Sequence, residues 1–144
     1  MVLTKEELRS LVECKSRSPH RLLGMHKLGD GAGLVARALA PNAAKVKLEP
    51  VHEKDKPTLE LKRIPKTDLF EATTQAADRV YAYDLVVTDP AGKVSRTRDP
   101  YSFLPTLSES DLYLFGKGDE WCIYEKLGSQ FRTIDGVAGA SFAV

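Results

Sequence analysis

One tryptophan carries the most suggestive chemistry in this sequence. Trp121 directly follows Asp119 and Glu120. An indole ring can stack on the face of a sugar while neighbouring carboxylates accept hydrogen bonds from the sugar hydroxyls. Tyr101, in an upstream Asp-Pro-Tyr turn, offers a second ring. Trp121, Tyr101 and Asp119 are therefore the candidate sugar-binding residues.

A packing role is the alternative for the same tryptophan. Trp121, Tyr124 and Leu127 recur every third residue, which places them on one side of a helical segment. Burial of a large aromatic side chain stabilises a protein by roughly 2–3 kcal/mol, more than one exposed sugar contact usually gives. The sequence favours a segment that these three side chains attach to the β-sandwich predicted below.

The other aromatics of this region are expected to pack as well. Six of the eleven aromatic residues lie between residues 98 and 128. Tyr101 and Phe103 straddle one serine, which predicts an extended pair on one face. Tyr113 and Phe115 are two apart on a predicted helix, so we expect only one of them to be fully buried.

Patterns for catalysis or metal binding are missing from the sequence. Cys14 and Cys122 fit neither a metal-ligand spacing nor a disulfide framework, and a zinc site from Cys14, His20 and His26 has no recognised spacing. The glycines of segment 28–35 precede a predicted strand, whereas a phosphate loop leads into a helix. We expect free thiols, a flexible entry loop, no catalytic residue, no metal and no cofactor.

Composition limits the class of protein. The chain has 144 residues, 42% of them apolar and 28% charged, as in a globular domain. Its net charge of +1 argues against nucleic acid as a partner. No apolar run approaches the roughly 18 residues of a membrane span, and the N-terminus lacks the apolar centre of a signal peptide. A cytoplasmic location without membrane contact is expected.

The periodicity of the chain predicts an all-β fold preceded by one helix. Thr4 and Glu7 have the spacing of a capping box, and Pro19 follows the end of the predicted helix. Turn residues then separate six short segments with period-two alternation. The predicted strands are 34–39, 45–49, 58–63, 69–73, 81–88 and 94–98. Short strands at such intervals indicate an antiparallel β-sandwich.

The pattern changes after residue 99. Ser108 or Ser110 can cap a short helix that Gly116 and Gly118 would end. The final residues alternate again, which we interpret as the first strand of a further module. The predicted domains are an N-terminal helix at 1–16, a sandwich at 17–106, a helical connector at 107–136 and the opening strand at 137–144.

A longer motif in the same region resembles the junction after the first N-terminal module of bacterial glycogen branching enzymes. The matching residues are Asp99, Pro100, Tyr101, Phe103, Leu107, Glu109, Asp111, Leu112, Leu114, Phe115, Gly118, Tyr124, Glu125, Leu127 and Gly128. An upstream Pro-x-x-x-Leu-Gly-x-His entry is similar too, through Pro19, Leu23, Gly24 and His26. Asp119, Glu120, Ser129 and Gln130 depart from the histidines that the family commonly has near these places.

The resemblance implies an immunoglobulin-like sandwich related to starch-type carbohydrate-binding modules. Its parent enzyme would transfer an α-1,4-glucan segment to form an α-1,6 branch, using paired carboxylates of a downstream barrel. The resemblance places no catalytic residue in this chain. Its implied partners are the downstream modules and, weakly, an α-glucan. Two alternatives stay open: a purely structural spacer, and a free-standing module similar to glycogen-targeting subunits.

Overall fold

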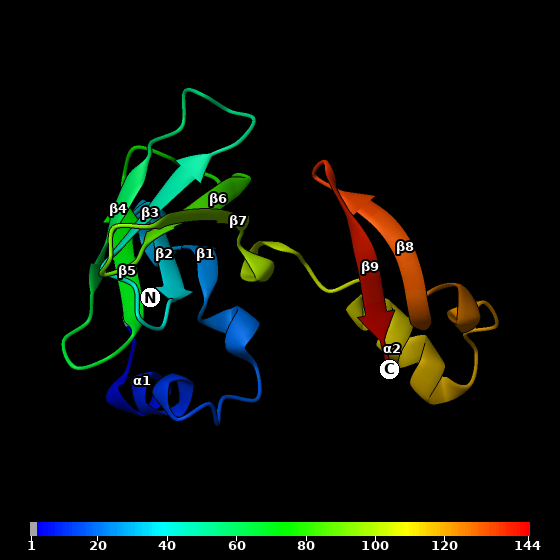
Figure 1. Cartoon of the computed structure of the whole chain (residues 1–144). Helices are drawn as coiled ribbons and strands as arrows, with labels where there is room; N and C mark the ends of the chain where they lie inside the picture. The colour runs from blue at the N-terminus through cyan, green and yellow to red at the C-terminus, as the bar shows by residue number, and fades with distance from the viewer. Residues whose placement is uncertain (1–2) are drawn as a thin grey trace. The chain divides into compact units, whose positions relative to one another are not determined.

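The computed structural model describes residues 3–144; residues 1–2 of the predicted N-terminal helix lie outside the described residues. The chain divides into two compact units, Met1–Ser102 and Phe103–Val144 (Figure 1). The first unit consists of α1 (Lys5–Val12), η1 (Pro19–Arg21), β1 (Gly24–Lys27), η2 (Gly29–Gly31), β2 (Leu34–Leu39), β3 (Lys45–Pro50), β4 (Leu59–Arg63), β5 (Leu69–Thr74), β6 (Tyr83–Thr88), β7 (Val94–Arg98) and η3 (Pro100–Ser102). The second consists of α2 (Glu109–Lys117), η4 (Ile123–Glu125), β8 (Gly128–Ile134) and β9 (Val137–Ala143).

The seven strands of the first unit form one antiparallel sheet that curls into a sandwich. Their order is β1-β2-β5-β4-β3-β6-β7. β4 joins the two halves: Leu59 and Leu61 pair with β3, whereas Lys62 and Arg63 pair with β5. The predicted all-β sandwich, with a short N-terminal helix and a short helical segment after it, is therefore confirmed.

Alternating side chains from both halves of the sheet meet in one core. Val46 and Leu48 of β3 and Tyr83 and Leu85 of β6 are buried there, as the period-two pattern predicts. Opposite them, the same cluster contains Met25, Leu34, Ala36, Ala38 and Phe70 of β1, β2 and β5. A single cluster from strands so far apart in the sheet order is the signature of two facing layers.

Helix α1 covers part of the outer surface of the sheet. Its predicted capping box is present: the Thr4 hydroxyl accepts from the Glu7 backbone N–H at 3.2 Å, and the Glu7 carboxylate accepts from the Thr4 backbone N–H at 2.9 Å. Leu11, the buried residue of the helix, lies in a second cluster with Leu23 and Leu69. Leu69 neighbours inward-facing Phe70, so this cluster lies on the opposite face of β5.

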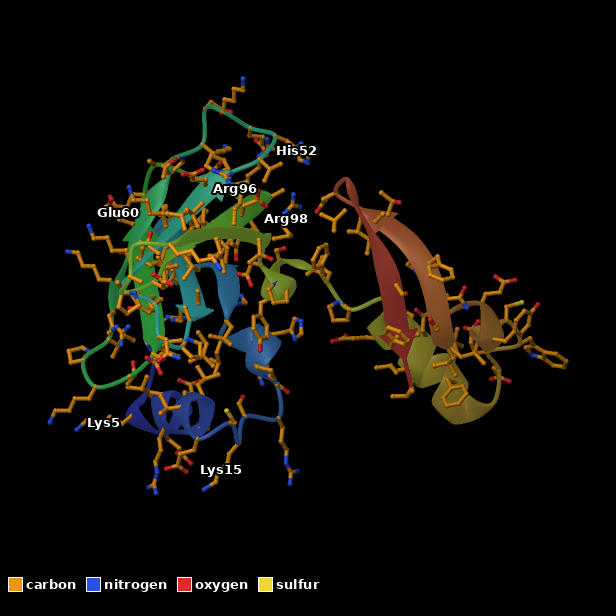
Figure 2. All side chains as sticks on the ribbon, viewed as in Figure 1. Lys5, Lys15, His52, Glu60, Arg96 and Arg98 are labelled. Carbon is orange, nitrogen blue, oxygen red and sulfur yellow. The ribbon has the colours of Figure 1, made fainter. Side chains whose placement is uncertain are left out.

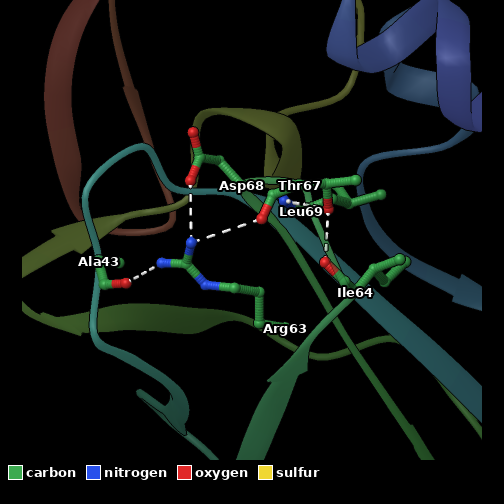
Figure 3. Close-up of polar contacts among 6 residues, drawn as sticks. All are labelled: Ala43, Arg63, Ile64, Thr67, Asp68 and Leu69. Carbon is green, nitrogen blue, oxygen red and sulfur yellow. Dashed lines mark hydrogen bonds and ion pairs between the residues drawn. The ribbon is translucent and has the colours of Figure 1, made fainter.

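One arginine seals an end of the core. The Arg63 guanidinium donates to the Ala43 carbonyl, to the Asp68 carboxylate at 3.1 Å and to the Thr67 carbonyl at 3.5 Å (Figure 3). It also lies 4.9 Å from the centroid of the Phe70 ring, a cation–π distance. The Arg63 side chain thereby connects the loop after β2 with the turn after β4.

Two strands are missing from the sequence prediction. β1 has only four residues and begins with a glycine, and β8 falls within the segment predicted as a helical connector. β8 and β9 form a hairpin through Asp135 and Gly136, which both have positive φ. Asp-Gly is a strong hairpin signal. Gly116 does not end α2 as predicted; Ser108 caps the start and Gly118, at φ 79°, ends the helix.

Candidate functional surface

The Asp-Pro-Tyr turn is organised around a buried carboxylate. Asp99 is only 1% exposed and accepts the Tyr83 hydroxyl at 2.5 Å and the Tyr101 backbone N–H at 2.9 Å. The Ser102 hydroxyl donates to the Asp99 carbonyl at 2.7 Å. Burial raises the pKa of Tyr83, and the charge of Asp99 beside it raises that pKa further. Tyr83 therefore stays a hydrogen-bond donor, which fixes the turn to β6.

Tyr101 is a packing residue in this arrangement. It lies in η3 and its ring meets the His20 ring edge-on, with 4.9 Å between centroids. The half-buried ring also packs against the cluster of Leu22 and Leu23. The predicted extended pair with Phe103 is wrong, because Tyr101 belongs to a 3-10 turn. Tyr101 is thus partly covered by its neighbours and offers less ring surface to a ligand than an exposed aromatic side chain would.

Trp121 and Asp119 are both exposed in the second unit. The Trp121 side chain is 86% exposed and that of Tyr124 is also exposed, so neither ring is covered within its own unit. Within the second unit, only Leu127 of the predicted packing face of Trp121, Tyr124 and Leu127 is partly buried. The Asp119 backbone N–H donates to the Leu114 carbonyl at 3.0 Å and closes α2, while its side chain remains accessible.

A charge pair holds the helical part of the second unit together. Asp111 accepts the Ser108 backbone N–H at 2.8 Å and the Lys126 ammonium at 2.5 Å. Hydrogen bonds from Lys126 first, then from Ser108, lower the pKa of Asp111 to about 2. The acidic residue of the first half of the junction motif is thus tied to the Tyr-Glu-x-Leu-Gly half.

Aromatic exposure differs sharply between the two units. The Phe and Tyr side chains of the first unit, namely Phe70, Tyr81, Tyr83 and Tyr101, are buried or half-buried. The second unit exposes Tyr113, Phe115, Trp121, Tyr124, Phe131 and Phe142. The prediction that either Tyr113 or Phe115 is fully buried is wrong.

The hairpin adds two aromatic residues that the sequence interpretation did not single out. Phe131 is 94% exposed and Phe142 is 77% exposed. Phe131 pairs with Ala140, and Phe142 pairs with Ser129. Residues opposite each other, and residues two apart on a strand, share a face, so both phenylalanines project from the same side of the hairpin. The Asp-Gly turn was the signal that places them there.

The outer face of β3, β6 and β7 is charged and internally paired. Arg98 contacts the Asp84 carboxylate at 2.9 Å, and Arg96 contacts the same carboxylate at 3.6 Å and also pairs with Glu49. Both arginines belong to β7 and are labelled in Figure 2. Surface ion pairs of this kind contribute little stability each. They leave this face polar and without an exposed ring on which a sugar could stack.

Residues 3–144 contain neither a cluster of metal-ligating side chains nor a helix that could span a membrane. Within that range, no group of three His, Cys, Asp or Glu side chains is placed to hold a metal ion. Cys14 and Cys122 are free and exposed. None of the helices described there has the length and apolarity required to cross a membrane.

The fold defines the chain as an immunoglobulin-like all-β module, a one-helix sandwich continued by a helix and a hairpin. The family model for the N-terminal domain of the alpha-1,4-glucan branching enzyme GlgB matches residues 4–101, more than half of the chain. The chain belongs to this family.

Similar proteins extend the match beyond the sandwich. The 1,4-alpha-glucan branching enzyme GlgB of Myxococcus xanthus is 38% identical over 142 residues, which are 96% of this chain and 18% of the relative. The GlgB proteins of Thiobacillus denitrificans and Methylococcus capsulatus are 39% and 35% identical, over 88% and 95% of this chain and 16% and 17% of theirs. The chain therefore spans less than a fifth of the length of these relatives.

Proposed function

We propose that this chain is a non-catalytic accessory module of a cytoplasmic 1,4-α-glucan branching enzyme, a parent that transfers an α-1,4-glucan segment to form an α-1,6 branch. Within that parent, the module orients the modules that follow it. The family membership of residues 4–101 and the match of the remainder to three branching enzymes support the assignment. The predicted boundaries at residues 106 and 136 remain part of this proposal.

One observation supports the proposed role in orienting the following modules. The second unit buries no large apolar side chain, and Asp111 is its one buried residue. It nevertheless exposes six aromatic rings. Exposed apolar surface of this density marks a surface that another protein layer covers. Phe131 and Phe142, on one side of the hairpin, are the strongest anchors for a following module.

The experiment compares one substitution in two lengths of protein. Phe131→Ser in the full-length parent should lower its melting temperature and its branching rate, because an anchor between modules is lost. The same substitution in residues 1–144 should leave the sandwich transition unchanged, since Phe131 is 94% exposed there. Thr133→Ser, on the same face of β8, is the control. Equal melting temperatures for the wild-type and Phe131→Ser parents would contradict the proposal.

A weak glucan contact at Trp121 is the second candidate function. The fully presented indole and the accessible Asp119 carboxylate favour it, and the half-buried Tyr101 contributes less. Residues 1–144 should then be retarded in native gels that contain amylopectin. Trp121→Ala should remove the part of this retardation that the tryptophan contact causes. Phe142→Ala, which removes another exposed ring, is the matched control. Unchanged retardation of Trp121→Ala would contradict a glucan contact at Trp121, and an absence of retardation in the wild type would leave the structural spacer as the better account.

A further inference from the structure

The strand shared by the two halves of the sandwich leaves a gap in the sheet. β4 pairs with β3 through Leu48↔Leu59 and Val46↔Leu61 and then with β5 through two residue pairs, Lys62↔Glu71 and Arg63↔Phe70. β5 continues to Thr74 beside β2. Beyond Glu71 the edge of β5 has no β4 residue opposite it. An open strand edge offers backbone donors and acceptors to whatever occupies it.

A hollow of about 410 Å³ lies at this divergence. Its polar lining comes from Glu60, Lys62 and Arg63 on β4 and from Glu71 and Thr73 on β5. Ile64 and Pro65, in the turn after β4, form an apolar wall. Small-ligand sites in proteins span roughly 300–1,000 Å³ and combine apolar surface with a few placed polar groups. The hollow has that size and that composition.

Two carboxylates, Glu60 and Glu71, and two cations, Lys62 and Arg63, line the hollow, and all but Lys62 have a charged partner. The Glu71 carboxylate is fixed by the Arg37 guanidinium at 2.6 Å, and Arg37 itself is 1% exposed. Glu60 is paired with Lys47 at 3.0 Å. Lys62 is exposed and forms no ion pair among the described residues. Carboxylates that already have a cation gain little from a further cation, but their remaining lone pairs accept from neutral donors.

These features select a neutral, hydroxyl-rich ligand. Sugar hydroxyls both donate and accept, so they can bond the Glu71 carboxylate, the Lys62 ammonium and the Thr73 hydroxyl without bringing a net charge. The carbon-bound hydrogens of a pyranose ring can pack on the apolar wall of Ile64 and Pro65. An anionic ligand would gain Lys62 but would lie against the carboxylates of Glu60 and Glu71, and the fourth charged residue of the lining, Arg63, already donates to Asp68 and to two backbone carbonyls.

We propose that the hollow between β4 and β5 binds a short stretch of an α-glucan chain, apart from any contact at Trp121. The sugar class rests on the proposed function, whereas the place and the polar contacts rest on Lys62, Glu71 and Thr73. The sandwich thereby gains a glucan subsite even though its aromatic rings are covered.

Affinity electrophoresis of residues 1–144 in gels of increasing amylopectin concentration tests the subsite. Lys62→Ala should weaken the apparent affinity about three- to tenfold, the loss of a charge-assisted hydrogen bond. Thr73→Arg should abolish it by filling the hollow. Lys93→Ala makes the same charge change at the exposed turn after β6 and should behave as wild type. Melting curves of the variants, compared with that of wild type, confirm that each is folded.

Amide chemical shifts on addition of maltoheptaose then locate the ligand. Shifts centred on Lys62, Glu71 and Thr73 are the expected result. Shifts confined to residues around Trp121, or equal affinity for wild type, Lys62→Ala and Thr73→Arg, would overturn the subsite. An absence of any shift would overturn it as well, yet would leave the orienting role intact, because that role is tested by the stability of the full-length parent.

Discussion

Two buried carboxylates explain much of the junction motif at the scale of single residues. Asp99 and Asp111 each accept a backbone N–H from their own turn and a side-chain donor from another element, Tyr83 and Lys126 respectively. Both donors satisfy carboxylate lone pairs that burial would otherwise leave unpaired. These aspartates therefore hold turns and helix ends in place.

Asp111 gives a pH prediction with a definite sign. Its pKa is lowered from the ordinary 3.8 to about 2 by Lys126 and Ser108. Its contribution to the stability of the helical segment is therefore fully present above pH 3.8 and is lost as the pH falls through about 2. Carbon-13 NMR titration of the carboxyl group should show the low inflection in wild type and a higher one in Lys126→Met.

Lys117→Met is the control for this titration. It removes the same charge from the last turn of α2, where the ammonium lies 4.6 Å from the Tyr113 ring centroid and away from the cap. It should leave the Asp111 inflection near that of wild type. An inflection for Lys126→Met as low as that of wild type would contradict the assigned cause.

The functional residues were only partly predictable from their types. The tryptophan beside two acidic residues is exposed within its own unit, whereas the spacing of Trp121, Tyr124 and Leu127 favoured packing. The exposure of Trp121 depends on which layers lie nearby, and no local pattern encodes that. Tyr101 shares its aromatic type with Trp121 and yet packs against His20. The Lys62 and Glu71 cluster depends on strand order, because residues nine positions apart meet only through the β4–β5 register.

At the scale of elements, the start of β2 depends on one glycine. Gly33 has φ +93°, and an added Cβ would lie 2.0 Å from the Thr74 carbonyl oxygen. Gly33→Ala should destabilise the sandwich by about 2–5 kcal/mol through backbone strain and overpacking combined. Urea unfolding followed by far-UV circular dichroism measures this loss.

Gly92→Ala separates backbone strain from overpacking. Gly92 has a similar φ of +85° in the turn after β6, but no atom lies within 4 Å of an added Cβ. Only the conformational strain of about 1–2 kcal/mol should remain. Equal losses for the two substitutions would refute the close approach of Gly33 to β5.

The strands were predictable where alternation was long and turns were clear. The segment at 45–49 and the segment at 81–88 carry alternate residues that are buried on the inner face, and Asp89 accepts from Ala91 and Lys93 in the turn that joins β6 to β7. β1 was missed because Met25 is its one large apolar residue and Gly24 is a poor strand former. Its pairing with β2 comes from tertiary context.

At the scale of the whole molecule, the two units should differ in local stability. The first has buried clusters on both faces of its sheet, whereas the second buries only Asp111. Local opening costs little free energy where few apolar contacts must be broken. Hydrogen–deuterium exchange of residues 1–144 should therefore be faster throughout 103–144 than in β3 and β6.

Exchange of the same peptides in the full-length parent is the control for this prediction. Exchange of 103–144 should slow in the full-length parent, where the proposed modules cover the hairpin, while exchange of β3 and β6 stays the same. Slow exchange of the second unit already in residues 1–144 would show that this unit needs no cover.

The divided pairing of β4 also has a consequence for cooperativity. Two sheets that touched only face to face could melt in separate steps. Here Leu61 pairs with β3 while the next residue, Lys62, pairs with β5. Detachment of β4 therefore leaves β3 and β5 with unpaired edges at the same time. Leu59 and Leu61 leave the common core in the same event. The seven strands are therefore expected to unfold as one two-state unit, with a denaturant dependence that reflects the surface of the entire sandwich.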